Sequence, residues 1–403
     1  MQARKRSSSS LSSAPPAPSS NASASSHSRS TASTHSIQKR QTSSSMRSLV
    51  LVLVMVPNLA LCGCYYGHLA SGQLRVLWQR QPIEKARVDP AHPEDVRALL
   101  GLVESVRRFA RELGLSVDDQ YTSYVDWPGD RMVTTIVRTR AGSLESVPWW
   151  FPMVGHLPYK GYFDRARAEA EAERLTRSGE YDVCVSGVAA YSTLGWLDDP
   201  VTQPMLRRGA ASLVETLLHE LVHATAFLAG EADFNEGVAQ FIGQQAAIRF
   251  FEQAERSAGA NEIAGLPSSE RVEATIADRW AIARWTIAFK DRVATLEKRP
   301  DRAAVRAKAE TEARAELAKI PLRVLEAEKV AIAARLSDAC LALRGTYIRD
   351  LPRHARVLAS LDGDLNAMIE RLRLWADESR SSADFFVDRA ARSSDRAQMG
   401  PAQ

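Results

Sequence analysis

The sequence predicts a predominantly helical α+β fold. Residues 211–240 contain two apolar helical segments, and the first carries the polar sequence His219-Glu220-Leu221-Val222-His223 at its centre. Residues 121–140 and 182–190 are rich in β-branched and aromatic residues, which favour strands. Residues 270–376 alternate in charge, as is typical of solvated helix faces. We therefore expect a small β-sheet beside the first helix and a long helical C-terminal region.

The His-Glu-x-x-His sequence places two histidines on one face of a helix. His219 and His223 are four residues apart, so their imidazoles can bind one metal ion. Glu220 lies about 100° around the helix, where its carboxylate can reach a water on that ion. Glu215, one turn before His219, either orients that imidazole or forms a surface ion pair. A chance match on a core helix is the alternative, but it would leave buried polar groups unpaired.

The segment after this helix supplies a further candidate ligand. Gly230 predicts the end of the first helix, and Asn235 is expected to be the N-cap of a second helix. Glu236 would then lie in its first turn. Antiparallel packing of the two helices would bring this carboxylate toward the histidines, and the small Gly237 and Ala239 would allow a close approach.

The expected metal is Zn2+. A catalytic zinc ion takes three protein ligands and keeps one open position, which His219, His223 and Glu236 satisfy. Glu231 and Asp233 are the competing acids for the third position. The set predicts a hydrolase in which the metal activates a water molecule.

Residues 235–239 are similar to the Asn-Glu-x-x-Ala motif that gives gluzincin metallopeptidases their third ligand, although only 12 residues separate His223 from Glu236. Most of the chain after Cys64 resembles the putative aminopeptidase family of bacterial lipoproteins. The resemblance is carried by residues 152–155, 158–163, 190–196, 219–225 and 234–236. It implies a zincin-like core and the hydrolysis of peptide substrates.

In the chemistry that this resemblance implies, Glu220 is the general base and a tyrosine stabilises the oxyanion, with Tyr191 and Tyr347 as candidates. The Gly-x-Met-Glu-Asn element, by which many gluzincin aminopeptidases hold a free amine, is absent from the sequence. Exopeptidase and endopeptidase action therefore both stay open. The alternatives are a catalytically silent envelope lipoprotein that acts as a scaffold and a zinc hydrolase of non-peptide bonds.

The N-terminal residues indicate export. Residues 1–45 contain 18 serines and cannot form a core, so they are either a disordered leader or an over-extended gene start. Residues 46–63 are expected to be a signal peptide, and residues 61–64 resemble a bacterial lipobox with Cys64 as the acylated residue. A plain signal peptide and a membrane anchor are the alternatives. We expect a lipid-anchored protein on the periplasmic face of the cell envelope, in the outer membrane.

The distribution of charge bears on the expected binding partners, and the cysteine content bears on a possible disulfide. The first 47 residues hold seven of the 52 basic residues and no acid, so 45 basic and 48 acidic residues remain. No basic surface is implied there, and nucleic acid is not an expected partner. After export, Cys184 and Cys340 remain. They either form a disulfide or stay as two buried thiols.

We expect a metallopeptidase core over residues 64–265, a helical region over residues 266–378 and a flexible tail over residues 379–403. Within the helical region, a helical hairpin is expected to bend at Pro321. Aromatic residues at 149–163 either line a substrate cleft or form a small core of their own. His156 in this stretch is expected to be a packed or surface residue rather than a fourth ligand.

Three further elements are predicted in the core. Residues 93–113 form an amphipathic helix that begins at a proline and is followed by Gly114. Residues 121–127 and 132–140 form the two strands of a hairpin. The strand at residues 182–190 either pairs with a substrate backbone or is an ordinary sheet strand.

Overall fold

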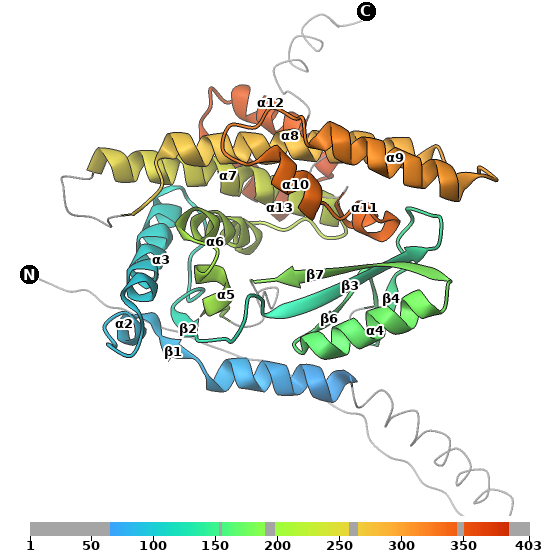
Figure 1. Cartoon of the computed structure of the whole chain (residues 1–403). Coiled ribbons are helices and arrows are strands. Elements are labelled where there is room, and N and C mark those ends of the chain that lie inside the picture. Colours follow the sequence, from blue (N-terminus) through green and yellow to red (C-terminus); the bar gives the residue numbers. More distant parts are fainter. Residues whose placement is uncertain (1–64, 153–154, 190–197, 258–264, 345–349, 387–403) are drawn as a thin grey trace, which may run out of the picture. The chain divides into compact units, whose positions relative to one another are not determined.

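Three helices carry the centre of the fold: α6 (Ala210–Thr225), α7 (Ala232–Ser257) and α8 (Ser269–Ala294). The computed structural model of the chain describes residues 65–152, 155–189, 198–257, 265–344 and 350–386. In Figure 1, α7 and α8 run side by side, and α6 packs against α7. Helix α3 (Glu94–Glu112) packs on α6, as its amphipathic pattern predicts.

The main hydrophobic core forms where these helices meet. On α6, the apolar residues that flank the polar centre are at most 1% exposed: Leu213, Val214, Leu217, Leu218, Leu221 and Val222. They join buried side chains of α3 and α7, among them Phe109, Phe250 and Phe251, in one cluster. The polar centre of α6 is therefore held by a rigid apolar frame.

A three-stranded antiparallel sheet lies beside the helices. Strand β3 (Val133–Arg140) is central and pairs with β6 (Tyr159–Tyr162) on one side and β7 (Tyr181–Val188) on the other. Helix α4 (Arg165–Arg177) packs on β3 and β7. Its N-cap Asp164 accepts hydrogen bonds from two backbone N–H groups. The predominantly helical α+β fold and the predicted strand at residues 182–190 are both confirmed.

The predicted hairpin of residues 121–140 is wrong. Strand β2 (Ser123–Val125) does not pair with β3 but lies between β1 (Gln81–Pro82) and β8 (Val201–Thr202). The pattern identified two strands correctly, but both long sides of β3 are taken by β6 and β7. A separate two-stranded sheet, β4 (Trp149–Phe151) with β5 (Gly155–Leu157), was not predicted and falls in the aromatic stretch.

All regular elements in the C-terminal part of the described chain are helices. Its elements are α9 (Arg302–Leu317), α10 (Ala327–Ala333), α11 (Asp338–Arg344), α12 (Leu351–Ala359), α13 (Leu365–Asp377) and α14 (Ser382–Phe385). Helices α9 and α10 pack together on either side of the predicted bend at Pro321. The buried carboxylate of Asp278 on α8 accepts backbone hydrogen bonds from residues 323–325 and fixes this connection. Helices α8, α12 and α13 all pack against α7.

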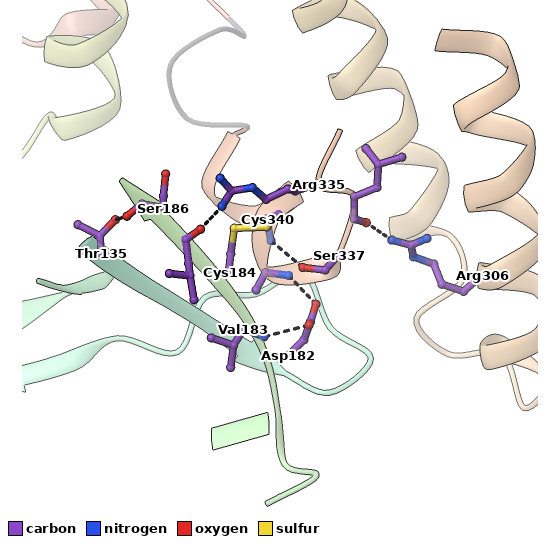
Figure 2. Close-up of a disulfide and its surroundings, with 12 residues drawn as sticks. Thr135, Asp182, Val183, Cys184, Ser186, Arg306, Arg335, Ser337 and Cys340 are labelled. Atoms are coloured by element: carbon purple, nitrogen blue, oxygen red, sulfur yellow. Dashed lines mark hydrogen bonds between the residues drawn. A yellow bond between two sulfur atoms is a disulfide. The ribbon is translucent and has the colours of Figure 1, made fainter. Parts of the chain in front are cut away.

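Cys184 on β7 and Cys340 on α11 form a disulfide (Figure 2), which decides between the two alternatives left by the sequence. Both cysteines are buried. Two polar contacts reinforce the link, because Asp182 accepts a hydrogen bond from the backbone N–H of Ala339 and Arg335 donates to the carbonyl of Val185. The first half of β7 is therefore tied to the helical region.

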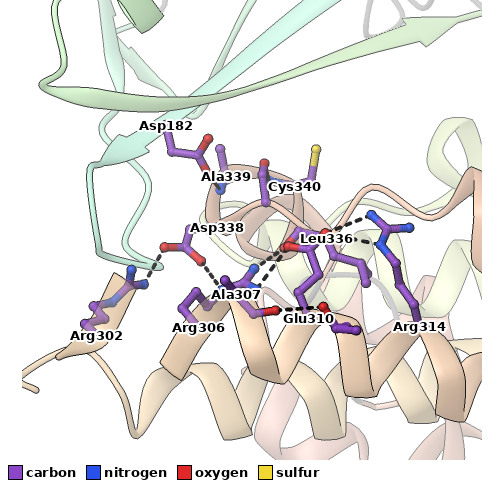
Figure 3. Close-up of polar contacts among 12 residues, drawn as sticks. Asp182, Arg302, Arg306, Ala307, Glu310, Arg314, Leu336, Asp338, Ala339 and Cys340 are labelled. Atoms are coloured by element: carbon purple, nitrogen blue, oxygen red, sulfur yellow. Dashed lines mark hydrogen bonds and ion pairs between the residues drawn. The ribbon is translucent and has the colours of Figure 1, made fainter. Parts of the chain in front are cut away.

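A buried ionic network ties α11 to α9 (Figure 3). The carboxylate of Asp338 accepts hydrogen bonds from Arg302 and Arg306, and Arg306 also donates to the carbonyl of Leu336. Since each charged group is paired, the network holds α11 in place without an unpaired buried charge. Within the described ranges, no helix is both long enough and apolar enough to cross a bilayer.

Candidate metal centre

The three predicted ligands converge. The Nε2 atoms of His219 and His223 lie 3.1 Å apart, and the Glu236 carboxylate lies 3.5 Å from the first and 3.6 Å from the second. Two donors that each lie about 2.1 Å from one tetrahedral ion are about 3.4 Å apart. The observed separations therefore match the set needed for one small divalent ion. Among the described residues, this is the group of histidine, cysteine and acidic side chains that could hold a metal.

The other residues considered as metal ligands lie away from this cluster. The Glu231 carboxylate accepts hydrogen bonds from the backbone and hydroxyl of Ser382, and Asp233 is exposed. His156 is an exposed residue of β5. The three converging side chains are themselves 17%, 19% and 35% exposed, so the site has an accessible side at which a water molecule or a substrate can bind. Two imidazoles, one carboxylate and an open side can hold a divalent metal ion and leave one position for a further ligand.

A glycine brings the two helices together, but it is not the one predicted. A Cβ atom on Gly243 would lie 3.0 Å from the backbone nitrogen of His219 and 3.1 Å from its Cα. Gly237 faces away from α6, and its Cβ would first meet the Nε2 atom of His354 at 3.4 Å. The close approach that positions His219 therefore depends on Gly243, two turns after Glu236.

Asn235 is not the N-cap of α7. The helix begins at Ala232, and the backbone N–H of Asn235 already donates to the carbonyl of Glu231. The buried Asn235 side chain instead bonds both backbone groups of Leu228: its Oδ1 accepts from the N–H at 2.9 Å, and its Nδ2 donates to the carbonyl at 2.7 Å. The residue pins the loop between the helices and so sets where Glu236 lies.

Glu215 forms an ion pair, as one of its two predicted roles required, but the pair involves a buried carboxylate and not one at the surface. Its buried carboxylate accepts hydrogen bonds from Gln240 at 2.8 Å and Gln244 at 3.1 Å, and it pairs with Arg279 of α8. No hydrogen bond to His219 is present. The hydrogen bonds and the ion pair of the Glu215 carboxylate therefore connect α6, α7 and α8. Glu215 supports the helices that carry the ligands rather than one imidazole.

The electrostatics of the cluster favour a carboxylate beside the imidazoles. Burial raises the pKa of Glu236, but hydrogen bonding to His219 and His223 outweighs it and brings this pKa down to about 2. Burial lowers the pKa of His219, but the bond to Glu236 and the nearby Glu220 charge outweigh it, so the net shift is upward. Without a metal, the cluster therefore attracts positive charge.

Glu220 occupies a different environment. Burial raises its pKa above that of an ordinary glutamate, and the two imidazoles only partly oppose this. A carboxylate with a raised pKa binds a proton more readily than an ordinary glutamate does, which suits a general base that later returns the proton as an acid. Tyr121, which was not predicted as a residue of the site, lies near this group. Burial, followed by the charge of Glu220, places its pKa well above the usual value.

The predicted oxyanion donors Tyr191 and Tyr347, and the predicted acylation site Cys64, lie outside the described residues. Tyr159 is a further candidate that was not predicted. It pairs with Val137, which also pairs with Cys184, so the three side chains lie on the face of the sheet turned toward α11. Tyr159 is 43% exposed, and its partial burial, followed by the charge of Glu236, raises its pKa.

A family model described as "Putative aminopeptidase" matches residues 64–384, about four-fifths of the chain. The chain belongs to this family. The matched part of this aminopeptidase-family protein includes α6, α7 and all three converging side chains. No curated protein and no solved structure matches the chain. Family membership therefore suggests a peptidase, and the arrangement of residues must supply the rest.

Proposed function

We propose that the protein is a zinc-dependent peptidase with a gluzincin-like active site, anchored in the bacterial cell envelope by a lipid on Cys64. The observation that carries the proposal is the convergence of His219, His223 and Glu236 at the spacing of one tetrahedral ion. Zn2+ bound there would lower the pKa of a coordinated water and polarise the substrate carbonyl.

Glu220 is the residue that moves the proton. It lies between the two histidines in the sequence of α6, and burial raises its pKa. In the proposed reaction its carboxylate takes a proton from the attacking water and passes it to the amine that leaves. The substrate carbon–nitrogen bond breaks, and the carboxylate is regenerated.

An additional donor is expected opposite the metal site. Tyr191 and Tyr347 remain predictions, and Tyr159 joins them because it projects from the sheet face turned toward the helices and interacts with the charge of Glu236. A phenol with a raised pKa stays protonated at neutral pH and can donate a hydrogen bond to a developing oxyanion.

The outer edge of β7 offers a limited place for a peptide backbone. The N–H of Val183 is bonded to the Asp182 carboxylate, and the carbonyl of Val185 is bonded to Arg335. Among the described residues, none bonds the outward backbone groups of Gly187. A peptide that adds to this edge can pair with both backbone groups of Gly187, whereas at Val183 and Val185 one of the two groups is already bonded.

The cellular setting of the proposal rests on other features. A disulfide between Cys184 and Cys340 is typical of proteins that fold in an oxidising compartment, such as the periplasm. The apolar residues 49–56 and the lipobox-like residues 61–64 agree with export and acylation. A catalytically silent envelope scaffold is the alternative function, and the charged helical region favours it.

Metal analysis paired with a peptide digest separates these functions. Purified wild-type protein should contain about one zinc ion and cleave members of a mixed peptide library. Glu220→Gln should lower hydrolysis by about 1,000-fold while zinc remains bound, because the change removes the general base and no ligand. A library with free and acetylated N-termini distinguishes exopeptidase from endopeptidase action, and a panel of esters tests non-peptide hydrolysis. Wild-type protein without metal or hydrolysis would support the scaffold.

A further inference from the structure

The first described helix, residues 65–78, is held against the fold along one side. Val76 is fully buried in a small cluster with Trp127. His68 accepts a hydrogen bond from the backbone N–H of Phe163 at 3.1 Å. Because these contacts come from one side of the helix, the opposite side is left outward.

The outward side is apolar. Its large exposed residues are Tyr66 at 37%, Leu74 at 48%, Leu77 at 36% and Trp78 at 84% exposure. At 3.6 residues per turn, these four side chains fall within about a third of the helix circumference. The described residues expose eleven large apolar side chains, so more than a third of them lie on this one short helix. Such a concentration marks an interaction surface.

The composition of the helix indicates what it contacts. Residues 65–80 contain no aspartate or glutamate and two arginines, Arg75 and Arg80. Tyr66 and Trp78 stand about 18 Å apart at the two ends of the apolar stripe. Tyrosine and tryptophan favour the boundary between lipid headgroups and acyl chains. Arg75 lies over the Trp127 ring, so it is the apolar residues and the aromatic ends of the stripe that indicate a lipid surface.

The position of the helix in the sequence points to the same partner. The apolar residues 49–56 and the lipobox-like residues 61–64 come directly before it. Whether that segment is kept as an anchor or Cys64 is acylated, the attachment to the membrane ends next to Tyr65. The apolar face is therefore brought to a bilayer by the chain itself.

We propose that the face formed by Tyr66, Leu74, Leu77 and Trp78 lies on the surface of a phospholipid bilayer and fixes the orientation of the protein on it. The proposal rests on the membrane attachment proposed above but not on the peptidase activity. A lipid attached at one residue holds the protein at the membrane but leaves it free to rotate about that attachment. A helix that lies in the interface supplies a second, oriented contact.

Quenching of fluorescence by brominated lipid tests the face directly. The full chain is reconstituted with vesicles of phosphatidylglycerol and phosphatidylcholine, with or without bromine on the acyl chains. Of the eight tryptophans, Trp78→Phe removes the proposed contact, and Trp150→Phe removes another exposed ring, 65% exposed on β4, as the matched control. We expect bromine to quench the wild type and Trp150→Phe, with the quenching lost in Trp78→Phe.

Flotation of the same samples with the vesicles reports attachment separately, and a peptide digest reports activity. Protein that floats but shows equal quenching in all three forms, or none in the wild type, overturns the proposed face and leaves the attachment standing. Protein that does not float overturns both. A Trp78 emission that shifts with protein concentration in the absence of lipid places a second copy on this face and also overturns the proposal.

Discussion

Histidine side chains contact α7 on two of its faces. On one face the imidazoles lie beside a carboxylate, and on the other the imidazole lies among aromatic rings. On the face toward α6, His219 and His223 lie within 3.6 Å of the Glu236 carboxylate. On another face, His354 of α12 is fully buried among phenylalanines, and neither ring nitrogen has a hydrogen-bond partner among the described residues. The aromatic rings around it belong to Phe234, Phe241, Phe385 and Phe386.

The comparison shows that burial alone does not make a metal site. Burial lowers the pKa of both His219 and His354. At His219 the carboxylate neighbours reverse the shift, whereas at His354 nothing does, and its pKa falls to about 4. A carboxylate that converges on the imidazoles therefore separates a site for a cation from a histidine that serves as a neutral core residue.

Removing that carboxylate should have the largest effect. Glu236→Ala takes away one of three proposed ligands, so zinc affinity should fall by more than about 100-fold, beyond the loss expected for a residue that only orients a ligand. Competition with a chromophoric chelator measures it. Glu231→Ala is the matched control, since that neighbouring acid bonds Ser382 and should keep its zinc. Equal losses in the two variants would contradict the assignment of Glu236.

The local part of this site could be predicted from the sequence. A spacing of four residues fixes His219 and His223 on one helix face, and a short connection leaves few ways to place Glu236. The partners of Glu215 could not be predicted in this way. Its ion pair with Arg279 joins residues 64 positions apart, and no local pattern records such a contact.

The sheet shows the same limit. Alternating apolar residues identified β2 and β3 as strands, but pairing depends on segments far along the chain. Tyr159 belongs to the aromatic stretch considered as cleft lining, but it was not predicted as an oxyanion donor, because its direction follows from the pairing of β6 with β3. Asn235 was misassigned for a different reason: its preference for an N-cap was overridden by two bonds to the backbone of Leu228.

The second prediction concerns the histidine without a partner. The pKa of His354 is about 4 in the folded protein and about 6.5 in the unfolded chain, so the unfolded chain binds the proton more readily. Its contribution to stability is complete above pH 6.5 and is lost as the pH falls toward 4. The difference of about 2.5 units corresponds to about 3 kcal/mol of unfolding free energy.

Urea unfolding of the wild type and His354→Leu between pH 7.5 and 4 measures this loss. The variant should lack the His354 part of the pH dependence, because leucine carries no proton in either state. His156→Leu, which changes an exposed histidine of β5, is the control and should follow the wild type. A variant at position 354 with the same pH dependence as the wild type would show that its burial does not control stability.

The smallest expected effect comes from adding a single methyl group to one face of α7 or to the other. In Gly243→Ala the new carbon would meet the His219 backbone at 3.0 Å, which is tighter than nine in ten real Cβ contacts, so α6 and α7 must shift apart by a few tenths of an ångström. We expect a loss of about 2 kcal/mol in unfolding free energy and weaker zinc binding. In Gly237→Ala the first contact is the tip of His354 at 3.4 Å. Because alanine favours helix over glycine by about 1 kcal/mol, that control should keep both its stability and its zinc affinity. If both variants lost stability but kept zinc, the close approach at Gly243 would serve packing alone.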